Sequence, residues 1–144
     1  MRILFIGDIM GRPGRRAVST EIPRLREEFG GFDFVIANGE NSAAGFGLTE
    51  KVMQELFSSG IDVLTNGNHV WDKKDFIPLL DEEPAVLRPA NHPKGTPGRG
   101  FAVFEKNGER LAVLSLQGRV YMPPLDGPFQ TALNLVDESS ASSI

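Results

Sequence analysis

Three short polar clusters in this sequence carry the oxygen and imidazole side chains that bind metals or move protons. Asp8 stands in the first cluster, and Glu40 with Asn41 in the second. Asn68 and His69 form the third. Two carboxylates placed side by side repel one another unless a cation neutralises them or one takes up a proton. If the clusters meet, a divalent cation or a pair of cations is the economical explanation, with Glu40 as the bridge between two metals.

Each of these residues also has an ordinary structural use. An Asp after a strand can cap the next helix, and Asn in a loop is commonly a turn residue. A histidine can be a simple hydrogen-bonding residue. Only the convergence of all three clusters favours a metal site, and a two-metal site at phosphorus stabilises both the attacking and the leaving oxygen.

Apolar runs precede the clusters and predict strands that end at them. Ile3 to Ile6 is continuous, as in a strand buried on both faces of a parallel sheet. Phe32 to Ala37 and Ile61 to Thr65 predict two further strands. Because the carboxyl ends of parallel strands share one sheet edge, the polar clusters should lie where open α/β sheets bind ligands.

Two helical patterns separate these strands. Residues 13–29 have apolar side chains at helical spacing, and Pro23 inside them predicts a kink or two short helices. A second helix should begin after Thr49 as its cap and stop at Gly60. The order strand, helix, strand, helix, strand predicts right-handed crossovers and an α/β fold.

The second half of the chain has a different pattern. A short helical stretch near 73–80 precedes a proline-rich excursion over 84–100. Residues 101–105 and 110–116 flank Asn107-Gly108, which predicts a hairpin that adds antiparallel strands to the sheet. Residues 137–144 are mostly Ser and acid, so we expect a domain over 1–136 followed by a frayed tail.

Composition excludes several classes of function. The 144 residues hold 15 basic and 19 acidic side chains, a net charge of −4 that argues against a duplex nucleic acid partner. No apolar run approaches the ~20 residues that span a bilayer, so no membrane association is expected. The absence of cysteine suits a reducing compartment, and we expect a cytoplasmic protein.

Three arginines and a second histidine allow more than one interpretation. The glycine-rich segment 7–16 opens a helix but lacks the Lys-Ser/Thr of a P-loop and the spacing of a dinucleotide fingerprint. Arg12, Arg15 and Arg16 could meet a phosphate, although a solvated surface is the commoner place for arginine. His92 lies in the proline-rich stretch, where a surface role is expected.

Four ordered motifs resemble the calcineurin-like metallophosphoesterases, and within them the bacterial YmdB-like subgroup of cyclic-nucleotide phosphodiesterases. The motifs are Gly7-Asp8, Gly39-Glu40-Asn41-Ser42-Ala43, Gly67-Asn68-His69-Val70-Trp71-Asp72 and Arg88-Pro89-Ala90-Asn91. Met10 stands where the superfamily has a histidine, and Glu40-Asn41 replaces its usual aspartate motif. Both departures are features of the subgroup.

The resemblance implies a layered α/β/α domain with two divalent metals, iron or manganese. It implies that Asp8 binds one metal, Glu40 bridges both and Asn68 binds the second. Asn41 would lie in the metal shell, and His69 would protonate the leaving oxygen. The implied reaction opens a 2′,3′-cyclic nucleotide to a nucleoside monophosphate with a metal-bound hydroxide.

The family pattern also includes a lone histidine and a Gly-x-His-x-His motif, and neither occurs in these residues. We therefore expect an incomplete domain whose oxygen-only site binds metal weakly and suits manganese or magnesium. An open sheet edge and apolar surface would favour a homo-oligomer. The alternatives are a truncated, catalytically incompetent metal- and phosphate-binding module, or an assembly subunit that receives imidazoles from another chain.

Overall fold

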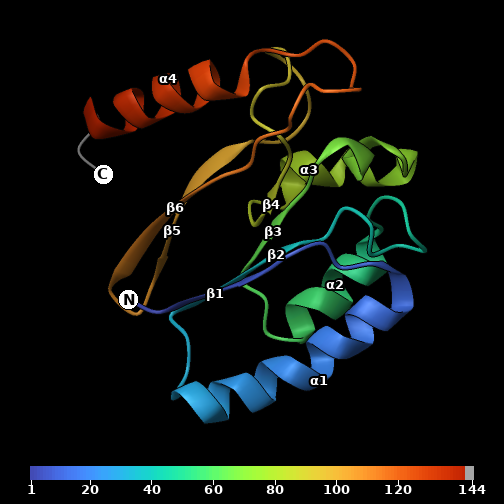
Figure 1. The fold of residues 1–144 in the computed structure, drawn as a ribbon, viewed down its shortest axis with the longest axis vertical. Coiled ribbons are helices and arrows are strands. Elements are labelled where there is room, and N and C mark those ends of the chain that lie inside the picture. Colours follow the sequence, from blue (N-terminus) through green and yellow to red (C-terminus); the bar gives the residue numbers. More distant parts are fainter. Residues whose placement is uncertain (142–144) are drawn as a thin grey trace.

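Four parallel strands frame the fold in the computed structural model, which describes residues 1–141 (Figure 1). They are β1 (Ile3–Ile6), β2 (Phe34–Asn38), β3 (Val63–Thr65) and β4 (Val86–Leu87), in the spatial order β1-β2-β3-β4. Ile6 is in register with Ala37, and Asn38 with Thr65. The first three strands therefore end at one edge of the sheet, and each is followed there by one of the predicted polar clusters.

Helices α1 (Gly11–Phe29) and α2 (Glu50–Ser58) cover one face of this sheet. Thr49 caps α2 as predicted, because its hydroxyl oxygen accepts a hydrogen bond from the backbone N–H of Val52 at 3.4 Å. The expected division at Pro23 is wrong, since α1 is one helix across that residue. Apolar side chains from both helices and the sheet form the main core, including Val35, Leu56 and Leu64, each of them fully buried.

The proline-rich stretch contains a strand that the sequence pattern did not predict. After β3 come two 3-10 turns, η1 (Asn68–Trp71) and η2 (Lys74–Phe76), and the short helix α3 (Leu79–Glu82). The chain then returns as β4, which pairs in parallel with β3. A two-residue strand beside prolines leaves no periodic signal, so β4 was missed. The third crossover of the sheet runs over 66–85, and the proline-rich loop follows β4.

The predicted hairpin forms but does not extend the sheet. Its strands are β5 (Phe101–Lys106) and β6 (Glu109–Leu114), joined by Asn107 and Gly108 with φ angles of 55° and 79°. Positive φ at both central residues is the requirement of a type I′ turn. The hairpin is a separate two-stranded sheet that packs on the face opposite α1 and α2 through Val113. The expectation of added strands is therefore wrong.

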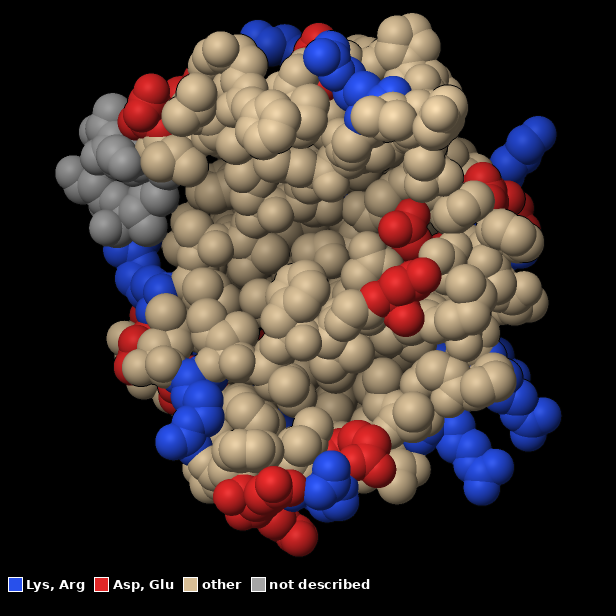
Figure 2. Space-filling view, viewed as in Figure 1, with Lys and Arg blue, Asp and Glu red and all other residues tan. Residues whose placement is uncertain are grey.

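Strand β1 is an edge strand and is not buried on both faces. Ile3 is 40% exposed and Phe5 is 62% exposed, because the hairpin packs on β2, β3 and β4 and leaves this face of β1 open. Figure 2 shows a broad, mostly uncharged surface on this side of the molecule. The continuous apolar run predicted a strand buried on both faces, and this is wrong because the hairpin does not reach across β1.

Helix α4 (Pro128–Ala141) lies on the hairpin side of the sheet in Figure 1. Its side chains Phe129, Leu133 and Val136 are exposed. The stretch expected to be a frayed tail continues this helix as far as Ala141, and 142–144 lie outside the described residues. Among the helices described, none combines the length and apolar character that a membrane span requires.

Candidate active site

Glu40 lies at the centre of the polar edge and is held by its neighbours. One of its carboxylate oxygens accepts a hydrogen bond from the backbone N–H of His69 at 3.2 Å. Its own backbone N–H donates to the Asn38 side-chain oxygen at 3.3 Å. A Cβ at Gly67 would lie 2.5 Å from Oε2 of Glu40, so only glycine admits the carboxylate at this distance. The loops after β2 and β3 thus meet at Glu40.

The backbone that carries Glu40 rests directly on the main core. The N–H of Gly39 donates to the carbonyl of Thr65 at 2.9 Å, which extends the β2–β3 pairing by one residue. A Cβ at Gly39 would lie 3.3 Å from Leu64 and 3.7 Å from Leu56. Packing under the helices therefore fixes the height of the loop in which Glu40 stands.

Asp8 and Asn41 form the second contact of this edge. The Asn41 side-chain N–H₂ donates to both carboxylate oxygens of Asp8, at 2.9 and 3.0 Å. The Asn41 carbonyl accepts from the N–H of Gly11 at 2.9 Å, so β1 and β2 present their loops together. The side-chain oxygen Oδ1 of Asn41 is buried and has no partner within residues 1–141. A buried oxygen of this kind is free to accept a hydrogen bond from water or to coordinate a cation.

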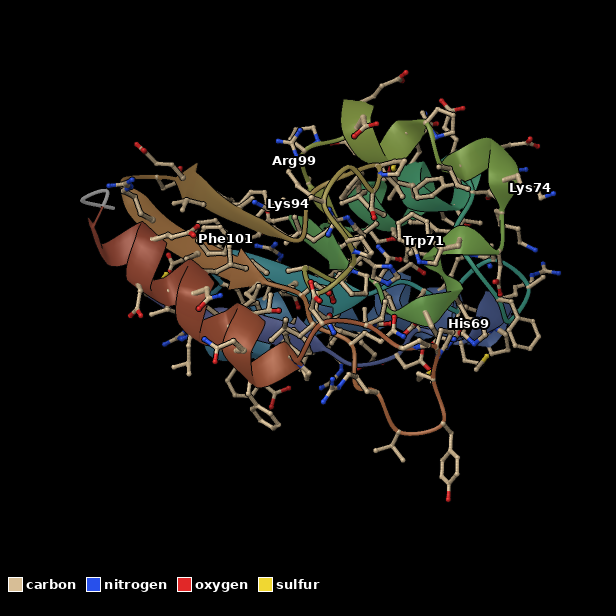
Figure 3. The ribbon with its side chains drawn as sticks, turned by 90° about the horizontal axis from the view of Figure 1, so that it is seen from above. His69, Trp71, Lys74, Lys94, Arg99 and Phe101 are labelled. Atoms are coloured by element: carbon tan, nitrogen blue, oxygen red, sulfur yellow. The ribbon has the colours of Figure 1, made fainter. Side chains whose placement is uncertain are left out.

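His69 is oriented by a carboxylate three residues further along the chain, just after η1. Its Nδ1 lies 2.7 Å from Oδ2 of Asp72, and its ring lies 5.0 Å from the ring of Phe46. Figure 3 shows His69 and Trp71 on the turn that follows β3. With Nδ1 engaged by Asp72, Nε2 is the nitrogen available to a ligand.

Asn68 is the first residue of η1 and is half-buried. Within residues 1–141, its side chain has no hydrogen bond to Asp8, Glu40 or Asn41. The structure therefore brings Glu40 to His69 and Asp8 to Asn41 by direct contacts. Asn68 joins them through its place in the chain, between Gly67 and His69.

The donors at this edge suit a hard divalent cation that is partly held by amide oxygens. No group of three or more His, Asp or Glu side chains converges among residues 1–141. Carboxylate and amide oxygens are nevertheless the ligands that manganese and magnesium prefer, and the unpartnered Oδ1 of Asn41 is an amide oxygen at this edge. The residues present thus fit manganese, one of the two metals that the resemblance implies.

Three residues that position the site were not predicted. Asp72 orients His69, and Gly67 makes room for the Glu40 carboxylate. The side-chain oxygen of Asn38 accepts a hydrogen bond from the backbone N–H of Glu40. The spacing of His69 and Asp72 on a helical turn was a usable signal for the first of these. Nothing in the sequence distinguishes Gly67 from an ordinary turn glycine, because its role depends on a carboxylate 27 residues away.

His92 has partners that its loop position did not suggest. Its ring lies 5.1 Å from that of Trp71, and its Nε2 lies 3.3 Å from Oε1 of Gln117. Burial lowers the pKa of His92 below its ordinary value of 6.5, against the hydrogen bond that its ring makes to Gln117, and the charge of Arg88 lowers the pKa further. His92 is therefore a half-buried packing residue rather than a free surface residue.

The parallel sheet, with carboxylates, amides and a histidine at its carboxyl edge, agrees with the metallophosphoesterase type that the motifs resemble. A solved structure described as a novel phosphatase from Mycoplasma pneumoniae superposes on it with a TM-score of 0.88 and 28% identity, over 96% of this chain and 51% of the other. The chain belongs to the YmdB-like protein family, whose family model matches residues 4–144. The family resemblance seen in the sequence motifs is thereby confirmed.

Two further relatives share more of the sequence. The 2′,3′-cyclic-nucleotide 2′-phosphodiesterase of Bacillus subtilis (strain 168) is 50% identical over 140 residues, which are 97% of this chain and 53% of that protein. A hypothetical protein from Thermus thermophilus superposes with a TM-score of 0.87 and 46% identity, over 96% of this chain and 53% of the other. The chain spans about half the length of the relatives it matches.

Proposed function

We propose that this chain carries part of the active site of a metal-dependent phosphodiesterase that hydrolyses 2′,3′-cyclic nucleotides. One observation carries the proposal: Glu40 stands between Gly67 and the N–H of His69, at the sheet edge where Asp8 and Asn41 meet. The name of the Bacillus subtilis relative, at 50% identity, supports the substrate class.

Asp8, Glu40, Asn41 and Asn68 are the residues that would hold two divalent metals, iron or manganese, with magnesium possible. When bound, such metals polarise a phosphoryl oxygen and lower the pKa of water at the site. The carboxylates of Asp8 and Glu40 supply the negative charge for two cations. The amide oxygen of Asn41 supplies a neutral ligand from a buried position.

His69 would supply the proton that the leaving oxygen needs. In the hydrolysis, water oxygen bonds to phosphorus, the bond from phosphorus to one ribose oxygen breaks, and that oxygen takes up a proton. Asp72 holds Nδ1 of His69 at 2.7 Å, which leaves Nε2 to carry the transferable proton. A positioned general acid contributes about 10²–10⁴ in rate.

Hydrolysis of a nucleoside 2′,3′-cyclic phosphate in the presence of Mn²⁺ tests the proposal. We expect turnover by the unmodified chain and a loss of about 10²–10⁴ in kcat for His69→Gln. His92→Gln is the matched control, because it removes the other histidine and is expected to keep the activity. Equal activity in His69→Gln and the unmodified chain would contradict the role of His69.

Gly67→Ala tests the geometry around Glu40. The added methyl group would meet the Glu40 carboxylate at 2.5 to 2.6 Å and must displace it. We expect a lower affinity for Mn²⁺ and a lower kcat, with an unchanged circular dichroism spectrum. Unchanged metal affinity in a folded Gly67→Ala variant would remove Glu40 from the proposed metal ligands.

One observation favours a second candidate, a metal- and phosphate-binding module without turnover. No three acidic or histidine side chains converge in the described part of the chain. Calorimetric titration with Mn²⁺, run in parallel with the turnover assay, separates the two. Metal binding without hydrolysis would support the module.

An assembly subunit that receives imidazoles from another chain is a further form of this candidate. Light scattering together with an activity test on mixed subunits would detect it. A homo-oligomer and a cytoplasmic location stay predictions.

A further inference from the structure

A cavity of about 350 Å³ lies beside the loop that follows Asn41. Arg12, Arg15 and Lys73 line it, and its other lining residues are Thr49, two alanines and a valine. No carboxylate is among the lining residues. The loop that brings Asn41 to Asp8 continues into this wall through Ala43 and Ala44. The cavity is thus a cationic neighbour of the candidate active site.

Arg15 is fixed in place by two partners. Its guanidinium donates to the carbonyl of Ser42 and pairs with Glu55, with 3.0 Å between Nε and Oε2. The side chain is 16% exposed. Ser42 directly follows Asn41, so Arg15 also ties α1 to the loop that carries the active-site amide.

The aliphatic part of Lys73 packs against Gly47. Gly47 has a φ angle of +76°, and a Cβ there would lie 2.8 Å from Cγ of Lys73. The missing side chain of Gly47 therefore makes room for the aliphatic stem of Lys73. Within residues 1–141, neither Lys73 nor Arg12 forms an ion pair. Two cations on this cavity thus lack a counter-charge.

The start of α1 makes this concentration of positive charge less favourable still. Its first turn has no acidic residue, and Met10 at the N-cap provides no side-chain hydrogen bond. The N-terminal end of a helix carries partial positive charge, so arginines placed there are opposed by the helix dipole. Figure 2 shows Lys and Arg side chains at the lower right, over the first half of α1. A bound anion would relieve this repulsion.

We propose that the cavity lined by Arg12, Arg15 and Lys73 binds a phosphate group. Guanidinium groups form paired, charge-assisted hydrogen bonds with phosphate oxygens, and an ammonium adds a further donor. The phosphate has two possible sources, a second phosphate of the nucleotide substrate or a separate phosphorylated ligand. The binding step needs no hydrolysis and no metal, so it stands apart from the proposed function.

The test is a calorimetric titration of the full chain, freed of metal by chelation, with inorganic phosphate. Without metal, the carboxylates of Asp8 and Glu40 repel the probe, so binding reports on the cationic cavity. We expect Arg12→Gln and Lys73→Gln each to weaken binding about tenfold, because each loses a charge-assisted hydrogen bond. Thermal melts of each variant check that the fold is intact.

Two controls remove the same charge from nearby positions outside the cavity. The controls are Arg16→Gln and Lys74→Gln. Arg16 follows Arg15 on α1 and does not line the cavity, and Lys74 follows Lys73 at the outer margin of the molecule (Figure 3). We expect less than about a twofold change from either. No saturable binding by the unmodified chain, or an equal loss in the controls, would overturn the site.

A second titration distinguishes the two sources of phosphate, and this arm alone rests on the proposed substrate class. It compares a nucleoside 2′,3′-cyclic phosphate with and without a 5′-phosphate. Tighter binding of the 5′-phosphorylated form, abolished in Lys73→Gln, would assign the cavity to the substrate. Equal binding, with inorganic phosphate still bound, would assign it to a separate ligand. Either result supports the phosphate site and decides between the two sources of phosphate.

Discussion

The two faces of the parallel sheet differ in how completely they are covered. Under α1 and α2, a continuous cluster joins β1 through β4 to both helices. On the other face, the β5–β6 hairpin meets only a small buried group that includes Ile36, Val63 and Leu87. Beyond it, Phe5 stays 62% exposed. The same apolar strands are thus closed on one side and partly open on the other.

This difference explains why the candidate active site is firmly held at one edge of a partly open domain. Leu56 and Leu64 lie under Gly39, the residue before Glu40. The helix-covered face therefore positions the site. The hairpin contributes little to the position of the site. It determines which part of the other sheet face is exposed to solvent.

The largest effect is expected on the helix-covered face, from Leu56→Ala. Leu56 is fully buried, and the change leaves a cavity directly beneath Gly39. We expect the free energy of unfolding to fall by about 2–5 kcal/mol, measured by urea denaturation. Gln54→Ala on the exposed side of α2 is the control. Similar losses in both variants would contradict the assignment of this face as the main core.

A smaller loss is expected on the hairpin face, from Val113→Ala. Val113 is 6% exposed and is the hairpin residue in the small cluster. Removing two buried carbons lowers the free energy of unfolding by roughly 1–2 kcal/mol. The urea midpoint measures it. A loss as large as that of Leu56→Ala would mean that the two faces contribute equally.

The next effect is a pH dependence of the free energy of unfolding that comes from His92, whose ring packs against Trp71. Because the folded pKa of His92 is lowered below 6.5, the unfolded chain takes up its proton first as the pH falls. The neutral His92 ring therefore makes its full contribution to the free energy of unfolding above pH 6.5, and this contribution decreases as the pH falls below that value. Unfolding free energies compared between pH 7.5 and 5.5 should fall less for His92→Gln than for the unmodified chain. Parallel curves for the two proteins would contradict the lowered pKa.

The smallest effect is expected at the open strand, from Phe5→Thr. The side chain is mostly exposed, so little buried apolar area is lost. We expect the free energy of unfolding, measured by urea denaturation, to change by less than about 0.5 kcal/mol. A destabilisation beyond about 1.5 kcal/mol, typical of a buried residue, would show that this face of β1 is covered in solution.

Local patterns in the sequence predicted most of the elements. Thr49 marked the start of α2, and Asn107-Gly108 marked the hairpin turn. The order of strands and helices placed Asp8, Glu40 and His69 at one sheet edge. These features depend on neighbouring residues in the sequence and on the shared direction of parallel strands, so they can be predicted from the sequence alone.

The remaining features depend on distant partners. The run from Ile3 to Ile6 has the pattern of a strand buried on both faces, and its exposed face follows from its edge position in the sheet. β4 is too short to show a period. The role of Gly67 appears only when the carboxylate of Glu40 stands beside it. No local pattern encodes such contacts.

The loop that runs from Asn41 to Gly47 has a thermodynamic consequence. One end of this loop holds Asp8, and its continuation walls the cavity of Arg12, Arg15 and Lys73. If occupation of one side favours a particular arrangement of this shared backbone, occupation of the other side must be favoured by the same factor. Measured affinities on the two sides of the loop would then be linked quantities rather than independent constants.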